Sequence, residues 1–327
     1  SEPTPVGEYT IQYGNNYTSR WGSYFDVKGE FTIQVTAKVT SEGTVAPAKK
    51  MTFDKTVTDT DGDGIYDLKL TLSGAVGSEV QKAKLDILFI VDTSGSMKKG
   101  MSSDRDANYP NRRIDNVASA MKSLVDTISE NSDKLDVMYS LVQFDGPSSV
   151  SGYGSQNNDA STLVNWTSNG ASITSVFNRN YTPENGTNYE AGITQGINQL
   201  NASSRSSAQK IVIFLTDGNP TAANNQKYSE SNNAAFMNAA NNAVAKLNCN
   251  QFYCIGAGPD FGSGELGVTN LNALINNVGT DASATAPSTK KYYQATDTTA
   301  LNKAFEEITS NTLYFLCEDV TITDTLH

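Results

Sequence analysis

The residues best suited to chemistry lie in the stretch DILFIVDTSGSM, where an apolar run ends on Asp92 and is followed by Ser94 and Ser96. A second apolar run, KIVIFLTD, ends on Asp217, and Thr187 lies in the stretch ENGTNYEAG just before a predicted helix. Two carboxylates with several neutral hydroxyls are hard oxygen donors, which suit a small octahedral cation such as Mg²⁺ or Mn²⁺. Because hydroxyl ligands add no negative charge, the cation would stay electrophilic toward a carboxylate from outside.

Other chemistries fit these residues less well. A phosphate cradle needs backbone N–H groups from a glycine-rich loop and a lysine, whereas DTSGSM has one glycine and leads with a carboxylate. A serine nucleophile needs a base, and the only histidine is His327. The alternative without function is that Asp92 to Ser96 caps a helix and that Asp217 is an unrelated loop acid.

The acidic composition argues against a nucleic-acid partner. The chain of 327 residues has 35 Asp and Glu against 24 Lys and Arg, a net charge of −11, whereas a phosphate-binding surface needs clustered basic residues. The longest apolar runs, 87–91 and 211–215, are far too short to span a bilayer, so we expect no membrane span. Few cysteines and many Asn, Ser, Thr and Gly are typical of an exported bacterial surface protein, and we interpret the chain as a mature or trimmed fragment of a larger anchored protein.

The chain consists of two kinds of segment, and the second of them carries these residues. In the first 80 residues, apolar and polar residues alternate in 29–40 and 64–74, which predicts half-buried antiparallel strands and a small all-β domain. From residue 85, continuous apolar strands alternate with helices, which predicts a mainly parallel, doubly wound α/β sheet covered on both faces. The predicted strands are 85–92, 135–144, 161–166, 210–217, 251–258 and 290–296, and the predicted helices are 114–130, 172–179, 188–200, 230–247, 265–278 and 299–310.

The domain boundaries follow from this change of pattern. Residues 1–80 form the β-rich domain and residues 81–312 the α/β domain. Alternation near the end of the chain predicts a strand from residue 313 that rejoins the first domain, so that 313–327 completes it. The α/β domain is then inserted in, or follows, the β domain. Because ligands of a doubly wound sheet bind beyond the carboxyl ends of its strands, Asp92 and Asp217 arrive on the same rim.

At these residues the sequence resembles the von Willebrand factor type A family, over roughly residues 85–312. The metal-ion-dependent adhesion site of that family combines an Asp-x-Ser-x-Ser run with a distant Thr and a distant Asp. The resemblance implies a Rossmann-like fold and a bound Mg²⁺, Mn²⁺ or Ca²⁺. It also implies that the serines and the threonine coordinate the cation and that the aspartates act directly or through water. The matching positions are Asp92, Ser94, Ser96, Thr187 and Asp217.

The stretch DTDGDGIYD has two interpretations. Its acidic residues Asp59, Asp61, Asp63 and Asp67 fall at positions 1, 3, 5 and 9 of an EF-hand loop, but position 12, which should be a bidentate Glu, is Leu70. The flanking residues alternate as strands and not as helices. We favour a hairpin turn with Gly and Asp in turn roles, and keep a calcium turn without helices as the alternative.

The β-rich segment, the α/β unit and the final VTITDTL together resemble Gram-positive bacterial surface and pilus-tip adhesins. Those proteins insert a type A domain into an Ig-like β domain, which often carries a Lys–Asn isopeptide crosslink. The resemblance therefore implies an Ig-like first domain and makes Lys55 a candidate isopeptide donor. A solvated lysine on a strand is the plainer alternative.

The three cysteines lack the paired spacing of a zinc site, and we predict a disulfide between Cys249 and Cys317. In a parallel sheet, Cys249 lies in the turn before the strand FYCIGAG, at the amino-end rim, and the helix 299–310 runs back toward that rim before Cys317. Cys254 points from the middle of its strand into the core, where a small apolar thiol fits. A Cys249–Cys254 bond would need a tight loop against an extended strand.

These features predict a non-enzymatic, metal-dependent adhesion module on a bacterial surface or pilus-tip protein. The cation would bridge the protein to an acidic group of an extracellular protein or glycan, and other pilus or surface subunits are further expected partners. The main alternative is a structural or assembly protein whose metal site only stabilises the rim. A metal-dependent hydrolase is a more distant alternative, because no general base is found beside the candidate site.

Overall fold

The computed structural model describes residues 7–18, 24–35, 52–58, 67–73 and 82–314. The chain divides into two compact units, one of residues 1–82 with 313–327 and one of residues 83–312. All five candidate metal residues lie in the second unit. No helix in the described part of the chain is long and apolar enough to cross a membrane.

The first unit contains antiparallel strand pairs. The pairs are β1 (Gly7–Thr18) with β2 (Tyr24–Val35), and β3 (Thr52–Thr58) with β4 (Asp67–Ser73). The second pair sets Thr58 opposite Asp67, so two antiparallel strands flank DTDGDGIYD, as the hairpin interpretation predicts. Sequence reasoning did not identify β1, although its residues also alternate.

The other predictions for this unit are only partly within the described residues. Lys55 lies on β3 opposite Leu70 of β4, and its isopeptide bond remains a prediction, as does the Ig-like arrangement. Asp67 is the first residue of β4, and the other three acids of the possible calcium turn, Asp59, Asp61 and Asp63, lie outside the described residues. The strand predicted from residue 313 is wrong at its start, because helix α7 (Thr298–Tyr314) continues the helical pattern through that position.

The second unit is built on a six-stranded sheet with the order β10-β9-β8-β5-β6-β7. The strands are β5 (Ala83–Asp92), β6 (Leu135–Phe144), β7 (Ala160–Thr167), β8 (Gln209–Thr216), β9 (Gln251–Ala257) and β10 (Thr289–Ala295). Neighbouring strands are parallel except for β6 and β7, which are antiparallel. The predicted mainly parallel sheet is therefore confirmed.

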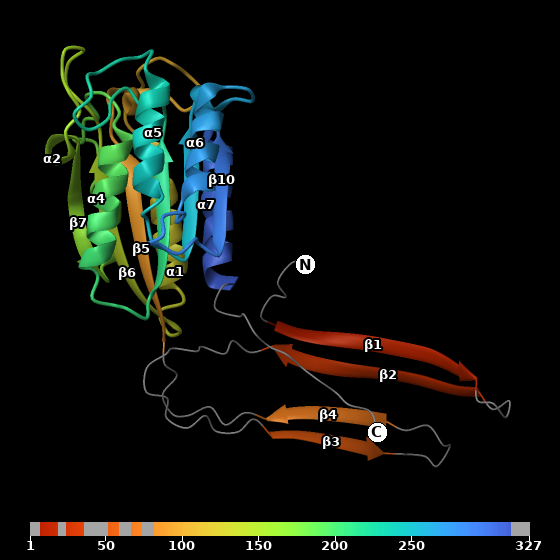
Figure 1. The fold of residues 1–327 in the computed structure, drawn as a ribbon. Coiled ribbons are helices and arrows are strands. Elements are labelled where there is room, and N and C mark those ends of the chain that lie inside the picture. Colours follow the sequence, from red (N-terminus) through yellow and green to blue (C-terminus); the bar gives the residue numbers. More distant parts are fainter. Residues whose placement is uncertain (1–6, 19–23, 36–51, 59–66, 74–81, 315–327) are drawn as a thin grey trace. The chain divides into compact units, whose positions relative to one another are not determined.

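Helices cover both faces of this sheet (Figure 1). The remaining helices are η1 (Gly95–Lys98), α1 (Arg113–Ser129), α2 (Gln156–Asp159), α3 (Gly170–Thr174), α4 (Tyr189–Ala202), α5 (Asn233–Val244), η2 (Pro259–Phe261) and α6 (Leu266–Asn277). Helices α4, α5 and α6 lie along one face, whereas α1 lies on the other and accepts a hydrogen bond from α7, from Thr298 Oγ1 to Asn116 Oδ1 (2.8 Å). The helix predicted at 172–179 is shorter and earlier, as α3, and the short helix α2 was not predicted.

Burial explains why these residues form central strands. Every residue of β9 is buried, and in β5 only Lys84 is exposed. Strands that are apolar on both sides need cover on both faces of the sheet. Helix α1 supplies part of that cover, because its buried side chains recur at helical spacing and form one apolar stripe.

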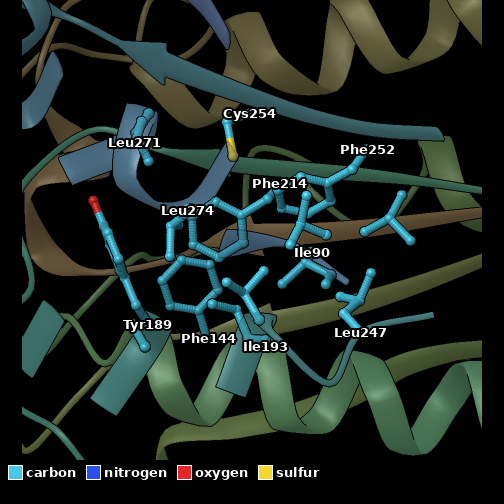
Figure 2. Close-up of a cluster of buried hydrophobic side chains, with 14 of the residues drawn as sticks. Ile90, Phe144, Tyr189, Ile193, Phe214, Leu247, Phe252, Cys254, Leu271 and Leu274 are labelled. Atoms are coloured by element: carbon cyan, nitrogen blue, oxygen red, sulfur yellow. The ribbon is translucent and has the colours of Figure 1, made fainter. Parts of the chain in front are cut away.

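The core on the α4 face supports the rim that carries the candidate site. Phe144 of β6 and Phe214 of β8 stack with ring centroids 5.1 Å apart, and the ring of Tyr189 meets both edge-on (Figure 2). The hydroxyl of Tyr189 donates to the carbonyl oxygen of Gly218 (2.5 Å). A Cβ on Gly192 would lie 2.6 Å from the Phe144 ring, so α4 packs directly against the sheet and ties the core to the loop after Asp217.

Candidate metal centre

The sheet topology brings Asp92 and Asp217 to one rim. Asp92 is the last residue of β5, and Asp217 directly follows β8, which is the parallel neighbour of β5. The register pairs Val91 with Leu215, so the two strands end at the same level. Both carboxylates are fully buried. The sequence prediction that they share a rim therefore agrees with their placement in the structure.

Hydrogen bonds fix both oxygens of Asp92. Its Oδ1 accepts from the backbone N–H of Ser94 (2.8 Å), and its Oδ2 accepts from the hydroxyl of Thr216 (2.6 Å). Burial, and after it the negative charge of Asp217, raises the pKa of Asp92 to about 7. Without a cation, burial and the neighbouring carboxylate disfavour the ionised form of Asp92. A divalent cation bound beside it would favour that form.

The serine hydroxyls of the motif converge with Asp217. Ser94 Oγ lies 3.1 Å from Ser96 Oγ, and Ser96 Oγ donates to Asp217 Oδ1 (2.6 Å). The separation of the two serine hydroxyls is that of a hydrogen bond in which either can donate, so three oxygens of the motif lie in one connected chain.

Asp217 is also bound to a residue that sequence reasoning missed. Arg113, the first residue of α1, is fully buried and its Nη1 donates to Asp217 Oδ2 (2.8 Å). Burial raises the pKa of Asp217, and the positive charge of Arg113 opposes that effect. Nothing in the sequence marks Arg113, because the motif that it supports is 104 positions away at Asp217.

The loop 99–112 encloses the Arg113 guanidinium. Its backbone pairs with itself at Gly100 and Arg112, and the carbonyl oxygens of Gly100 and Ser103 accept from Arg113 Nε (3.2 Å) and Nη2 (2.9 Å). Gly258 closes the other side at φ 107°, and a Cβ there would lie 2.9 Å from Arg113 Cζ. The loop 99–112 therefore surrounds the guanidinium that pairs with Asp217.

Thr187 is held between the two motif loops by its backbone. The loop before it is hydrogen-bonded to the Asp92 motif, from Gly95 N–H to Asn185 O (3.0 Å). On the other side, the N–H of Thr187 donates to Thr221 Oγ1 (2.9 Å) and its carbonyl oxygen accepts from the N–H of Thr221 (2.9 Å). Thr187 is 5% exposed. Its loop is thus placed against the segments that follow both β5 and β8.

A third carboxylate on this rim was not singled out from the sequence. Asp145 directly follows β6, and its Oδ2 accepts from Asn185 Nδ2 (2.8 Å). Burial is the main cause that raises the pKa of Asp145 to about 7. Its position after an apolar strand is the same signal that identified Asp92, so the pattern of the sequence could have found it.

The donor set consists mainly of hydroxyls. Within residues 82–314 and the other described segments, no group of three or more His, Cys, Asp and Glu side chains could hold a metal ion. A centre of two carboxylates and three hydroxyls does not need such a group. The chemistry and spacing of Ser94, Ser96 and Asp217 fit a hard divalent cation.

Two of the three cysteines lie on or next to β9. Cys249 precedes this strand and Cys254 lies within it; both are buried, and they are not bonded to each other. Cys317 is outside the described residues. The Cys249–Cys317 disulfide therefore remains a prediction.

Comparisons with known proteins identify the fold. The family model described as von Willebrand factor type A domain matches residues 86–307. No curated protein matches the chain in sequence. Among solved structures, the chain is similar to the PilB minor pilin from Streptococcus sanguinis at 16% identity, with a TM-score of 0.54, over 93% of this chain and 85% of that chain. It is similar to the pilus adhesin SpaC from Lactobacillus rhamnosus GG at 18% identity, with a TM-score of 0.52, over 84% of this chain and 36% of that chain.

Proposed function

The chain belongs to the von Willebrand factor type A family, matched over residues 86–307, and from that membership we propose that it is an adhesion module that captures its ligand through a divalent cation. The observation that carries the proposal is the convergence of three oxygens at the carboxyl rim of the sheet. Ser94 Oγ and Ser96 Oγ are 3.1 Å apart, and Ser96 Oγ is 2.6 Å from Asp217 Oδ1.

Each residue of the centre has a role in this proposal. Ser94, Ser96 and Thr187 would supply neutral oxygen ligands, and Asp92 and Asp217 would act directly or through water. Mg²⁺, Mn²⁺ or Ca²⁺ bound there offers an open coordination position to a carboxylate of the ligand. Mg²⁺ and Mn²⁺ are the favoured ions, because both take hard oxygen ligands in octahedral geometry.

Contacts within the protein favour a binding role over a purely structural one. The Arg113 guanidinium holds Asp217, and the hydroxyl of Thr216 holds Asp92. A rim already closed by these bonds does not need a cation to keep its shape. A cation added to it is therefore available to a ligand.

The proposed setting is the extracellular surface of a bacterium. It is supported by the fold shared with a minor pilin and a pilus adhesin. We propose an extracellular protein or glycan with an acidic group as the ligand, and other pilus or surface subunits as structural partners. No catalytic role is proposed.

Calorimetric titration of Mg²⁺ and Mn²⁺ tests the centre. Asp92→Asn keeps the size of the side chain but removes its charge, so cation binding should be lost while the fold is retained. Asp133→Asn is the matched control, because Asp133 is an exposed acid just before β6, at the opposite end of the strands. Equal Mg²⁺ affinity in wild-type and Asp92→Asn protein would overturn the assignment of the site.

A binding screen tests the adhesive role. Matrix proteins and glycans are presented to the wild-type protein with Mg²⁺ and with a chelator. We expect at least one acidic ligand to bind only with Mg²⁺ and to be lost in Asp92→Asn. Cation binding that changes thermal stability, with no cation-dependent ligand in the screen, supports the structural alternative.

A further inference from the structure

An exposed arginine is stacked on a tyrosine beside the candidate metal centre. The guanidinium carbon of Arg179 lies 5.5 Å from the ring centroid of Tyr109, and that of Arg112 lies 5.9 Å from it. Tyr109 is 45% exposed, and Arg179 is exposed as well. A guanidinium over an aromatic face is restrained without losing its hydrogen-bond donors.

Arg112 joins the two loops that carry this pair. Its Nη1 donates to Tyr181 O (2.6 Å) and its Nη2 donates to Asn178 O (3.2 Å). The same side chain forms an ion pair with Asp115 (2.7 Å) and is nearly buried. Tyr109, on the loop 99–112, and Arg179, on the loop before α4, are therefore held by one anchored side chain.

The pair lies next to the metal centre. Arg179 is two residues from Tyr181, a separation that spans at most about 7 Å of chain. The hydroxyl of Tyr181 donates to Oε1 of Gln143 (2.5 Å), two residues before the rim acid Asp145. The same loop returns to the motif at Glu184, whose N–H donates to Thr93 O (3.0 Å).

The charge of Arg179 is not neutralised within the described unit. None of the ion pairs among described residues includes Arg179, nor Lys98 and Arg105 on the neighbouring segment. The whole chain has a net charge of −11, so an exposed arginine without an ion pair among the described residues is a local exception. Such a guanidinium attracts an anionic partner by charge complementarity.

We propose that Arg179, restrained by Tyr109, is a second anionic subsite that binds a carboxylate of an acidic polypeptide whose other carboxylate reaches the metal centre. This inference rests on the proposed function and names the class of its ligand. A polypeptide fits better than an acidic sugar, because two guanidinium groups already lie over the Tyr109 ring that a sugar would stack on. Glutamate side chains on an extended peptide can reach two separate subsites.

Two ten-residue peptides test the subsite, one of ten glutamates and one of nine glutamines with a central glutamate, each titrated in excess Mg²⁺. Wild-type protein should bind the all-glutamate peptide more tightly. Arg179→Gln should lower the affinity for the all-glutamate peptide about three- to tenfold, which is the range expected for one charge-assisted contact at a surface. The affinity for the single-glutamate peptide should not change. Tyr109→Phe should keep the wild-type affinity and Tyr109→Ala should weaken it, because Arg179 lies over the aromatic ring, which phenylalanine keeps and alanine removes.

Lys134→Gln is the control for net charge, because it removes one positive charge as Arg179→Gln does and Lys134 is exposed just before β6, at the opposite end of the strands. Its affinities should match the wild type. If the single-glutamate peptide binds and Arg179→Gln has no effect on either peptide, the subsite is overturned and the proposed function stands. If neither peptide binds in Mg²⁺, both the subsite and the proposed function are overturned. Tighter binding of polygalacturonate than of the all-glutamate peptide would overturn the assignment to a polypeptide.

Discussion

Arg113 Nη1 lies 2.8 Å from Asp217 Oδ2, and neither side chain is exposed to solvent. One oxygen of Asp217 accepts from the buried guanidinium of Arg113, and the other accepts from the hydroxyl of Ser96. A divalent cation bound there would share Asp217 with Arg113. The centre therefore combines two carboxylates with one guanidinium, which leaves it more electropositive, once loaded, than the motif residues alone imply.

Arg113→Met should destabilise the α/β unit by about 3–5 kcal/mol, because it leaves Asp217 buried and unpaired. The free energy of unfolding is measured in urea with chelator present, by following helical circular dichroism. Lys122→Met is the control, since the Lys122–Asp126 pair is more than half exposed and should contribute at most about 1 kcal/mol. A loss below that of the control would contradict the role given to the buried pair.

Cation affinity should rise with pH up to about pH 7. The carboxyl of Asp92, with its pKa raised to about 7, holds a proton below that pH, and a cation must displace it. The expected change is roughly tenfold in affinity for each pH unit below 7. Calorimetry in two buffers of different ionisation enthalpy measures the protons released. An affinity that is flat from pH 5.5 to about pH 8 would contradict this prediction.

Without a cation, the α/β unit should lose stability as the pH rises from about 4 to 7. Burial raises the pKa of Asp145 to about 7, so this acid is deprotonated in the unfolded chain at a lower pH than in the folded one. Asp145→Asn, whose amide oxygen can still accept from Asn185, should be more stable than wild type at pH 8 and not at pH 4. Urea unfolding at both pH values with chelator checks this. An equal effect of the substitution at both would show that the charge of Asp145 is not the cause.

Gly192→Ala should destabilise the unit by about 1–3 kcal/mol, as expected for overpacking of a core. The added Cβ would lie 2.6 Å from the ring of Phe144, which is itself packed against Phe214. Asn201→Ala on the same helix is the control, because Asn201 is exposed and alanine favours helix. Thermal unfolding of the two variants side by side gives the comparison, and equal midpoints would contradict the close packing.

Peptide mapping without reductant should find Cys249 joined to Cys317 in protein from an oxidising compartment. Cys249 lies at the amino end of β9, on the side toward which α7 runs from the metal rim. Burial raises the pKa of Cys254 far above its usual range, so this thiol should resist alkylation in the native protein. A free Cys317, or a Cys249–Cys254 bond, would refute the pairing.

Much of the fold was predictable because its strands are buried on both faces. The continuous apolar runs of β5 and β8 identified them as central strands of a parallel sheet, and strand polarity then placed Asp92 and Asp217 at one rim. The five motif positions could also be proposed from the sequence, since their residue types and order are local features of the chain, and their role as cation ligands stays a prediction. The antiparallel β7 and the end of α7 were not, because apolar periodicity gives neither strand direction nor the residue at which a helix stops.

The sequence by itself determined the strands, the rim and the residue types that could hold a cation. The tertiary structure alone decided which polar side chains meet. Arg113 pairs with Asp217, Thr216 donates to Asp92, and Arg179 lies over Tyr109. Each of these pairs joins separate segments, and the path of the loop 99–112 selects the partners for two of them. Hydrophobic periodicity specifies which face of an element is buried, whereas a contact between polar side chains depends on how distant segments are folded together.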